Sequence, residues 1–261
     1  FTSGTEGLPK AVELSFQNIF YSAQGWNEIL HFSIEEIYLN ILPISHISGL
    51  SIFFRSIYFN FTVCYFKYSE NQILDYLQLA QPQYLSIVPK IADDLMRNKK
   101  SADILKLLKT LIIGGDAIDR SYFSYCKSNN IKSYVSYGMT ETTSGIAGYF
   151  INDENKFNLN YIGCPHENVE ININEDDRIQ IQSKVIAVNF QDSSHTLISN
   201  DYGEMIENKL FFKSREDHII ISGGKNINLK FIKNILSNFE LNLIVIGYND
   251  SKWGRVPVVV Y

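Results

Sequence analysis

The chain has 261 residues, of which 45% are hydrophobic and 20% charged, a composition typical of a folded globular protein. Its 23 basic and 28 acidic residues give a net charge of −5, which excludes a global positive field for nucleic acid or anionic lipid. No apolar run reaches the roughly 20 residues that a membrane-spanning helix needs. We therefore expect a cytoplasmic protein without a nucleic-acid or membrane partner, whose three widely spaced cysteines are reduced, buried thiols.

The first part of the chain alternates predicted helices and strands. Ser15 is a good N-cap residue, and apolar residues follow it at three- and four-residue spacing, which predicts an amphipathic helix over 15–30. The next expected elements are strand 37–43, helix 49–60, strand 62–66, helix 70–80, strand 84–88, helix 90–98, strand 108–113, helix 119–129 and strand 133–137. This alternation predicts an α/β fold with a parallel sheet over residues 1–160.

The texture of the sequence changes after about residue 160. Short β-like runs at 169–173, 178–182 and 209–212 are joined by Asn, Asp, Ser and Gly, which predicts a small β-rich subdomain over 161–216. An isoleucine run at 219–221, a helix near 229–239 and a strand over 241–247 predict a partial α+β domain over 217–261. Because the chain opens on Phe1, at what looks like the end of a strand, we expect it to be a piece of a longer protein.

The opening segment concentrates groups that bind phosphate. They are Thr2, Ser3, Gly4, Thr5, Gly7 and Lys10. Glycines let backbone N–H groups approach an oxyanion, hydroxyls donate hydrogen bonds and a lysine adds a point charge. The spacing is not that of a Walker A loop. Taken alone, such a cluster is more often a plain polar turn.

Further segments in the same order make the chain resemble the adenylate-forming superfamily of acyl-CoA synthetases, luciferases and peptide-synthetase adenylation domains. Residues 2–10 resemble its phosphate loop, and Gly-Gly-Asp-Ala at 114–117 resembles its glycine turn against adenine. Ser-Tyr-Gly-Met-Thr-Glu-Thr at 136–142 resembles its adenine and magnesium motif. Asp201 stands at the position of the ribose-binding carboxylate, and residues 213–228 resemble the hinge into the mobile C-terminal domain.

The resemblance implies an α/β adenylate-forming core that uses ATP and Mg²⁺, with coenzyme A as co-substrate. An acid would attack the α-phosphate of ATP, and the CoA thiol would then displace AMP. Lys10, Thr140 and Glu141 would act at the phosphates, with Glu141 as the metal ligand. The residues implied to hold the nucleotide are Thr2, Ser3, Gly4, Thr5, Gly7, Gly114, Gly115, Ser136, Tyr137, Gly138, Met139, Asp201 and Arg215. Glu216 and Asp217 would be hinge positions.

One segment narrows the choice of acid. Residues 42–51, followed by Arg55, are similar to the version found in o-succinylbenzoate:CoA ligases of menaquinone biosynthesis. The resemblance implies that His46, Ser48, Arg55 and Gly138 bind the acid, with Arg55 on the second carboxylate of a dicarboxylic substrate. The plainer interpretations are a structural histidine and a solvated arginine. The other histidines match no catalytic position and are expected at the surface or in loops: His31, His166, His195 and His218.

Several positions depart from the family pattern. Glu6 stands where the loop usually has Thr, and Gly145 replaces a Gln frequent in the o-succinylbenzoate ligases. Lys213-Ser214 align with the family's Gly-Arg pair, which leaves only the adjacent Arg215 near the ribose. The family's N-terminal subdomain and final lysine motif would lie outside the chain, so we expect these residues alone to be inactive. Two alternatives stay open, a superfamily ligase for another acid and a degenerate, non-catalytic nucleotide-binding homologue. A homodimer is left open as well.

Overall fold

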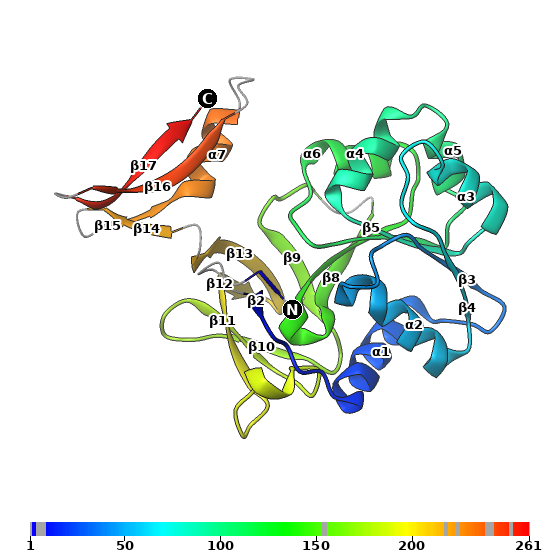
Figure 1. Ribbon diagram of the computed structural model, residues 1–261, viewed down its shortest axis with the longest axis horizontal. Coiled ribbons are helices and arrows are strands. Elements are labelled where there is room, and N and C mark those ends of the chain that lie inside the picture. Colours follow the sequence, from blue (N-terminus) through cyan, green and yellow to red (C-terminus); the bar gives the residue numbers. More distant parts are fainter. Residues whose placement is uncertain are drawn as a thin grey trace.

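The computed structural model describes residues 2–3, 9–152, 156–216, 219–222, 225–237, 243–250 and 253–260. Figure 1 shows a large body that holds the helices α1 to α6 and a small body that holds the last strands and α7. The chain passes from the large body to the small one after β13 (Lys209–Arg215).

Five parallel strands form one half of the main sheet. They are β3 (Ile37–Asn40), β4 (Thr62–Tyr65), β5 (Tyr84–Ile87), β6 (Thr110–Ile113) and β7 (Ser133–Met139), in the spatial order β4-β3-β5-β6-β7. All residues of β5 and β6 are buried, as expected of parallel strands that are covered on both faces. The predicted α/β class with a parallel sheet is confirmed.

Helices cover both faces of this parallel half. The helices are α1 (Phe16–Leu30), α2 (Ile47–Phe59), α3 (Ile73–Ala80), α4 (Pro89–Arg97), α5 (Ser101–Leu105) and α6 (Arg120–Ser128). On one face, α1 and α2 pack through Trp26 and Ile52 against Tyr38 and Tyr84. On the other face, α3 to α6 pack against neighbours such as Leu85. The alternation of side chains along each strand therefore divides the core into two layers.

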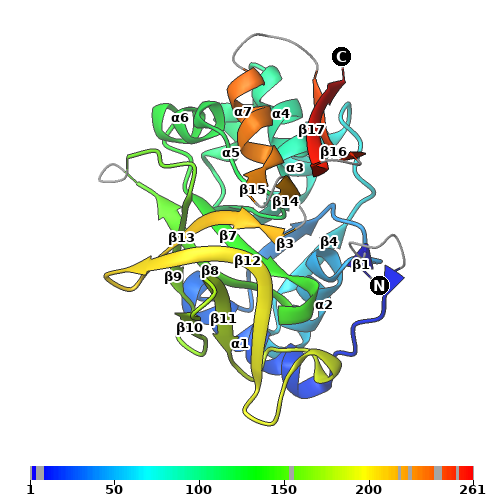
Figure 2. The ribbon, with the colours of Figure 1, turned by 90° about the vertical axis from the view of Figure 1, so that its left-hand side faces the viewer.

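The second half of the sheet is antiparallel. It consists of β8 (Ser144–Ile151), β9 (Tyr161–Pro165), β10 (Glu170–Ile173), β11 (Arg178–Gln182), β12 (Thr196–Ile206) and β13. The complete eleven-stranded order is β10-β11-β12-β13-β9-β8-β7-β6-β5-β3-β4. Figure 2 shows β12 and β13 lying side by side across this end of the large body. The boundary expected at residue 160 thus lies between two strands, β8 and β9, that pair with each other.

The small body is an α+β unit. It has four antiparallel strands, β14 (Ile219–Ser222), β15 (Lys225–Asn228), β16 (Ile244–Asp250) and β17 (Gly254–Val260), in the order β15-β14-β17-β16. Helix α7 (Leu229–Ser237) lies beside β16. At the other end of the chain, β1 (Thr2–Ser3) and β2 (Pro9–Lys10) form a short antiparallel pair.

Local sequence signals explain where α1 begins. The Ser15 hydroxyl accepts from the backbone N–H of Asn18, and the Asn18 side chain accepts from the backbone N–H of Ser15, so the two residues form a capping box. Asn18 also donates to the carbonyls of Lys184 and Ile186 at 2.9 and 2.8 Å, which fastens the helix to the antiparallel half of the sheet. The helix predicted over 15–30 is therefore confirmed.

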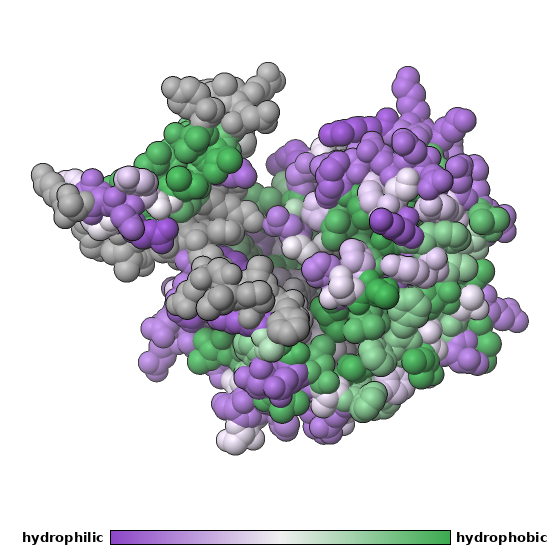
Figure 3. Space-filling model, viewed as in Figure 1, coloured by the Kyte–Doolittle hydropathy of each residue, from purple (hydrophilic) through white to green (hydrophobic). Residues whose placement is uncertain are grey.

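Surface properties differ in one respect from the expectation. The three cysteines are free, but only Cys126 is buried. Cys64 is half-buried and Cys164 points outward from β9, so the prediction of three buried thiols is wrong for these two residues. Figure 3 shows apolar residues gathered on the surface over α1 and α2, where Phe16 and Ile57 are among the exposed side chains. None of the helices in the described ranges has the length and apolar character that a membrane crossing requires.

Candidate active site

A cavity of about 180 Å³ lies where the parallel strands β6 and β7 end. The carboxyl ends of parallel strands form the crevice in which α/β proteins bind ligands. The lining includes Gly115 from the turn after β6, residues 135–139 of β7, and Asp201 and Arg215 from β12 and β13. Two segments of the predicted nucleotide site and the predicted ribose carboxylate are thus brought together from elements far apart in the sequence.

Two glycines are required by the shape of this cavity. Gly115 has a φ of +90°, in the left-handed region that side chains rarely adopt. A Cβ atom on Gly138 would lie 2.0 Å from the carbonyl oxygen of Ser144, so the strand pair could not close around any other residue. Gly114 lies against β7, with the position of its missing Cβ 3.2 Å from the carbonyl oxygen of Ser136. The Gly114-Gly115 turn and strand β7 therefore form one wall of the cavity.

The carboxylate of Asp201 is held inside this wall. Its side chain is 5% exposed, and its Oδ2 accepts a hydrogen bond of 2.6 Å from the hydroxyl of Tyr137. Burial and the adjacent carboxylate raise the pKa of Tyr137 well above its usual value, so the phenol stays protonated and donates. The other oxygen, Oδ1, is buried without a hydrogen-bond partner. A buried acceptor without a donor fits a ligand hydroxyl, such as one on a ribose.

The strand register places the predicted Arg215 beside the predicted Asp201. Asp201 on β12 is paired with Arg215 on β13, and the Arg215 Nε lies 3.6 Å from the Asp201 Oδ1. Lys213-Ser214 align with the family's Gly-Arg pair, so Arg215 is the arginine available near the ribose carboxylate. The paired strands bring Arg215 to Asp201, because a register shift between Tyr202 and Gly203 sets which residues face each other.

A short turn after β7 carries the predicted metal ligand. Thr140, Glu141 and Thr142 form a 3-10 turn in which Thr142 is buried and its hydroxyl accepts from the backbone N–H of Met139 at 3.1 Å. The backbone carbonyl of Glu141 accepts from the N–H of Ala187 at 2.8 Å, while its side chain remains half-buried. The described residues contain no group of three or more metal-ligating side chains. A single accessible carboxylate fits Mg²⁺ bound through phosphates and water, because this ion takes only one or two ligands from protein.

The predicted phosphate loop is described only at its two ends. The strands β1 and β2 place Thr2 opposite Lys10, so the two ends of the loop meet. The predicted residues Gly4, Thr5, Glu6 and Gly7 lie outside the described residues. At the predicted hinge, Glu216 accepts from Arg178 at 2.7 Å, while Asp217 and His218 also lie outside them.

Arg55 is buried rather than solvated. It is 3% exposed, and its guanidinium lies 4.4 Å from the centroid of the Trp26 ring and donates to the Ser144 hydroxyl at 2.8 Å. Burial lowers the pKa of Arg55 to about 10, and the neighbouring Tyr38 hydroxyl offsets part of that fall. The interpretation as a solvated helix residue is therefore wrong. His46 and Ser48, at the start of α2, are exposed, and neither they nor Arg55 line the 180 Å³ cavity.

His166 is buried, contrary to the prediction. We expected it at the surface or in a loop, but it is 3% exposed and its Nε2 is 3.0 Å from the hydroxyl of Tyr134. His166 directly follows β9, and its backbone N–H donates to the carbonyl of Ile146 at 2.8 Å. Its ring faces the Trp26 ring, and the two ring centroids are 5.4 Å apart. Burial, together with the positive charge of Arg55, lowers the pKa of His166 to about 3, so the ring is neutral.

A family model described as AMP-binding enzyme matches residues 1–184. The chain belongs to the AMP-binding enzyme family. It is 30% identical over 274 residues to the 2-succinylbenzoate–CoA ligase of Listeria monocytogenes serotype 4b, covering 99% of this chain and 58% of the relative. It is 29% identical to the Staphylococcus aureus (strain MRSA252) protein of the same name, covering 100% of this chain and 56% of that protein. The chain thus spans less than two thirds of these relatives.

Solved members of the family share the fold. The o-succinylbenzoate CoA synthetase of Bacillus subtilis in complex with the acyl-adenylate intermediate OSB-AMP superposes with a TM-score of 0.85 at 26% identity, over 99% of this chain and 57% of that one. The same enzyme in complex with ATP and magnesium ion gives a TM-score of 0.84 at 25% identity, over 99% and 58%. The mixed α/β sheet described above is therefore the fold of these family members.

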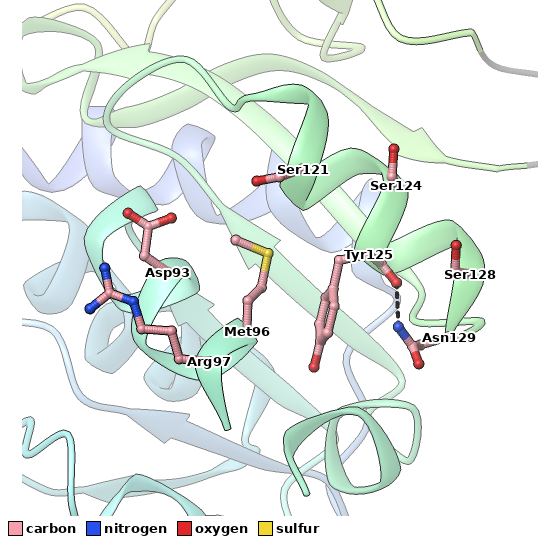
Figure 4. Close-up of a pocket in the computed structure, with 8 residues that line it drawn as sticks. All are labelled: Asp93, Met96, Arg97, Ser121, Ser124, Tyr125, Ser128 and Asn129. Carbon is pink, nitrogen blue, oxygen red and sulfur yellow. Dashed lines mark hydrogen bonds between the residues drawn. The ribbon is translucent and has the colours of Figure 1, made fainter. Parts of the chain in front are cut away.

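Another hollow of the described surface lies away from the predicted AMP-binding motifs. That hollow, of about 610 Å³, lies between α4 and α6. Figure 4 shows its mixed lining, with Asp93, Met96 and Arg97 from α4 and with three serines and Tyr125 from α6. None of the predicted site residues contributes to it. By contrast, the cavity near Asp201 also includes Tyr161 and Phe212, which sequence reasoning missed because only the pairing of β9 with β13 brings them there.

Proposed function

We propose that this chain is the nucleotide-binding core of an ATP-dependent ligase that converts o-succinylbenzoate to o-succinylbenzoyl-CoA in menaquinone biosynthesis. The observation that carries the proposal is the buried Asp201 Oδ1, which accepts no hydrogen bond and lies on a cavity lined by the glycine turn and by Arg215. The choice of acid is supported by relatives named 2-succinylbenzoate–CoA ligase that align with 99% or more of the chain. We propose ATP and CoA as its small-molecule co-substrates and the cytoplasm as its location.

In this proposal, one group of residues binds the ribose and the base of the nucleotide, and another group binds its phosphates. Asp201 Oδ1 accepts from the ribose hydroxyls, and Arg215 adds a donor beside it. Ser136, Tyr137, Gly138, Met139 and the Gly114-Gly115 turn line the place of the base. Lys10 and Thr140 neutralise and orient the phosphates, together with Thr2, Ser3, Gly4, Thr5 and Gly7 of the loop. Mg²⁺, held by Glu141, supplies charge neutralisation on the phosphates when it is bound.

The reaction then proceeds in two steps, adenylation of the acid and formation of the thioester. A carboxylate oxygen of the acid attacks the α-phosphorus in line, an O–P bond forms, and pyrophosphate leaves with the electron pair of the bond that breaks. The CoA thiolate next attacks the acyl carbonyl, a C–S bond forms, the C–O bond between the acyl group and the phosphate breaks, and AMP leaves with the electron pair of that bond. The protein supplies no nucleophile. Its residues hold the reactants in line and stabilise the charge that develops on phosphate oxygens.

The acid site is proposed on the α1–α2 side of the sheet. Arg55 is a buried cation, and no carboxylate of the described residues lies within 4.0 Å of it. A second carboxylate on the acid would provide the missing counter-charge. His46 and Ser48, exposed at the start of α2, are placed at the entrance. Glu216 and Asp217 form the hinge on which the small body would turn between the two steps.

The proposal is tested by pyrophosphate exchange into ATP in the protein at its full natural length. The acids compared are o-succinylbenzoate, 4-oxo-4-phenylbutanoate (the same molecule without its ring carboxylate), a fatty acid and an amino acid. Exchange dependent on o-succinylbenzoate supports the proposal. Exchange with another acid alone would change the substrate but keep the class of ligase. ATP binding without exchange for any acid would favour a degenerate nucleotide-binding homologue.

A further inference from the structure

Behind the wall of the cavity, the polar side chains of Trp26, Arg55 and the half-buried Ser144 form a cluster. Trp26 and Arg55 are each 3% exposed. The indole Nε1 donates to the Ser144 Oγ at 3.1 Å, and the Arg55 Nη2 donates to the same atom at 2.8 Å. The guanidinium lies 4.4 Å from the centroid of the indole ring. Each member of the cluster thus contacts both others.

The cluster has donors left over. Both lone pairs of the Ser144 hydroxyl are used by Trp26 and Arg55, so its O–H is available to donate, and no described residue accepts from it. The Arg55 Nε is buried without a partner. The guanidinium also has no carboxylate within 4.0 Å among the described residues. A buried cation without a counter-charge is costly, and two spare donors beside it match the oxygens of an anion.

The backbone around Ser144 is arranged to keep this geometry. Thr143 and Ser144 have φ values of 55° and 115°, an unusual conformation for residues with side chains. The Thr142 hydroxyl donates to the carbonyl of Ser144 at 2.9 Å and holds the strained turn in place. This turn directly follows the Thr140-Glu141 segment, so one short stretch of chain connects the cluster with the nucleotide side of the site.

The Trp26 indole occupies the space that a side chain at position 145 would need. A Cβ atom on Gly145 would lie 2.6 Å from the indole Cζ2 and 2.2 Å from the Ser136 Oγ. Gly145 is paired with Gly138 across β7 and β8, and both Ser136 and Gly138 line the cavity. The indole therefore packs directly behind the cavity wall, separated from it by glycine backbone and one serine.

We propose that Trp26 is a positioning residue that holds Arg55 and Ser144 as the anion-binding end of the acid site. The indole face stabilises the desolvated guanidinium, and its N–H fixes the orientation of the Ser144 hydroxyl. The preference for a dicarboxylic over a monocarboxylic acid is thus set by a residue that touches Arg55 rather than the acid. This inference rests on the proposed ligase function.

The test compares two acids in the protein at its full natural length. Trp26→Leu removes the ring and the N–H, Trp26→Phe keeps a ring only, and Trp253→Phe changes the other tryptophan, which is exposed on the small body. We expect Trp26→Leu to raise the KM for o-succinylbenzoate about tenfold, with smaller changes in kcat and in the KM for ATP. The KM for 4-oxo-4-phenylbutanoate changes little. Trp26→Phe lies between Trp26→Leu and the wild type, and Trp253→Phe matches the wild type.

Other results would overturn the inference. An equal rise in the KM for both acids, or a parallel rise in the KM for ATP, would show that Trp26 only supports the fold. An unchanged KM for o-succinylbenzoate in Trp26→Leu would show that Arg55 needs no such support. A wild-type protein that turns over neither acid would refute the proposed function itself, and the inference with it, before any variant is measured.

Discussion

Asp201 and Arg215 face each other across β12 and β13, with the Arg215 Nε 3.6 Å from the Asp201 Oδ1. That oxygen has no hydrogen-bond donor, although the other oxygen of the same carboxylate is bonded to Tyr137. The pair therefore presents one acceptor and one cation to the same cavity. This is the arrangement on which the nucleotide assignment depends.

Asp201→Asn tests this assignment. The amide keeps the size of the side chain but loses the charge, and lost hydrogen bonds to the ribose cost about 1–3 kcal/mol. We expect ATP to bind about tenfold more weakly, measured by isothermal titration calorimetry. Asp103→Asn, on an exposed carboxylate of α5, is the matched control. An unaltered ATP affinity in Asp201→Asn would contradict the assigned role.

Glu141→Gln tests the metal ligand. Its side chain lies on a turn held by Thr142 and by the bond of its own carbonyl to Ala187, so the backbone does not depend on the carboxylate. We expect pyrophosphate release to fall by about a hundredfold or more, because the carboxylate no longer binds Mg²⁺. Circular dichroism should remain unchanged. Glu28→Gln, exposed on α1, should release pyrophosphate at the wild-type rate, and normal release by Glu141→Gln would reject the role.

Asn18→Ala tests how α1 is fastened to the antiparallel half of the sheet. The substitution removes the capping box with Ser15 and leaves the buried carbonyl of Ile186 without its donor. We expect the free energy of unfolding to fall by about 1–3 kcal/mol, measured by urea denaturation. Gln17→Ala changes an exposed neighbour on the same helix and should alter the stability far less. Equal effects of the two substitutions would show that these hydrogen bonds contribute little.

The buried, neutral His166 predicts how stability depends on pH. Its pKa is about 3 in the folded protein and about 6.5 in the unfolded chain, so the unfolded chain binds the additional proton between these values. Stability that is complete above pH 6.5 is therefore lost as the pH falls toward 3. In His166→Gln, we expect a shallower decline of the unfolding free energy over that window. His195→Gln, on an exposed ring, should retain the wild-type slope, and identical slopes for all three proteins would contradict the prediction.

Local sequence signals are sufficient to predict several elements of the fold. The Ser15 cap and the apolar spacing after it define α1, and the apolar runs define the buried strands such as β5 and β6. The strand β8 was not predicted, since Gly145 and Gly148 interrupt its apolar pattern. Glycine is needed there because a Cβ atom on Gly148 would lie 2.4 Å from the carbonyl oxygen of Val135.

Tertiary pairing determines the rest of the site. Motif spacing brought the glycine turn, the β7 segment and Asp201 into one candidate site, and the structure places them on one cavity. No local signal shows that Arg55 is buried against Trp26, or that His166 is enclosed by Tyr134. These contacts join segments about 30 residues apart, so they follow from the packing of α1, α2 and β9 on the sheet rather than from the residue types alone.

The most direct test of the central claim is mass-spectrometric detection of the product. The protein at its full natural length is incubated with Mg²⁺, ATP, CoA and o-succinylbenzoate, and the reaction is repeated without CoA. We predict AMP and o-succinylbenzoyl-CoA in the complete reaction, and pyrophosphate with acyl-adenylate when CoA is absent. Measurable ATP binding without adenylate or thioester, for this acid and for the other acids compared, would contradict the account.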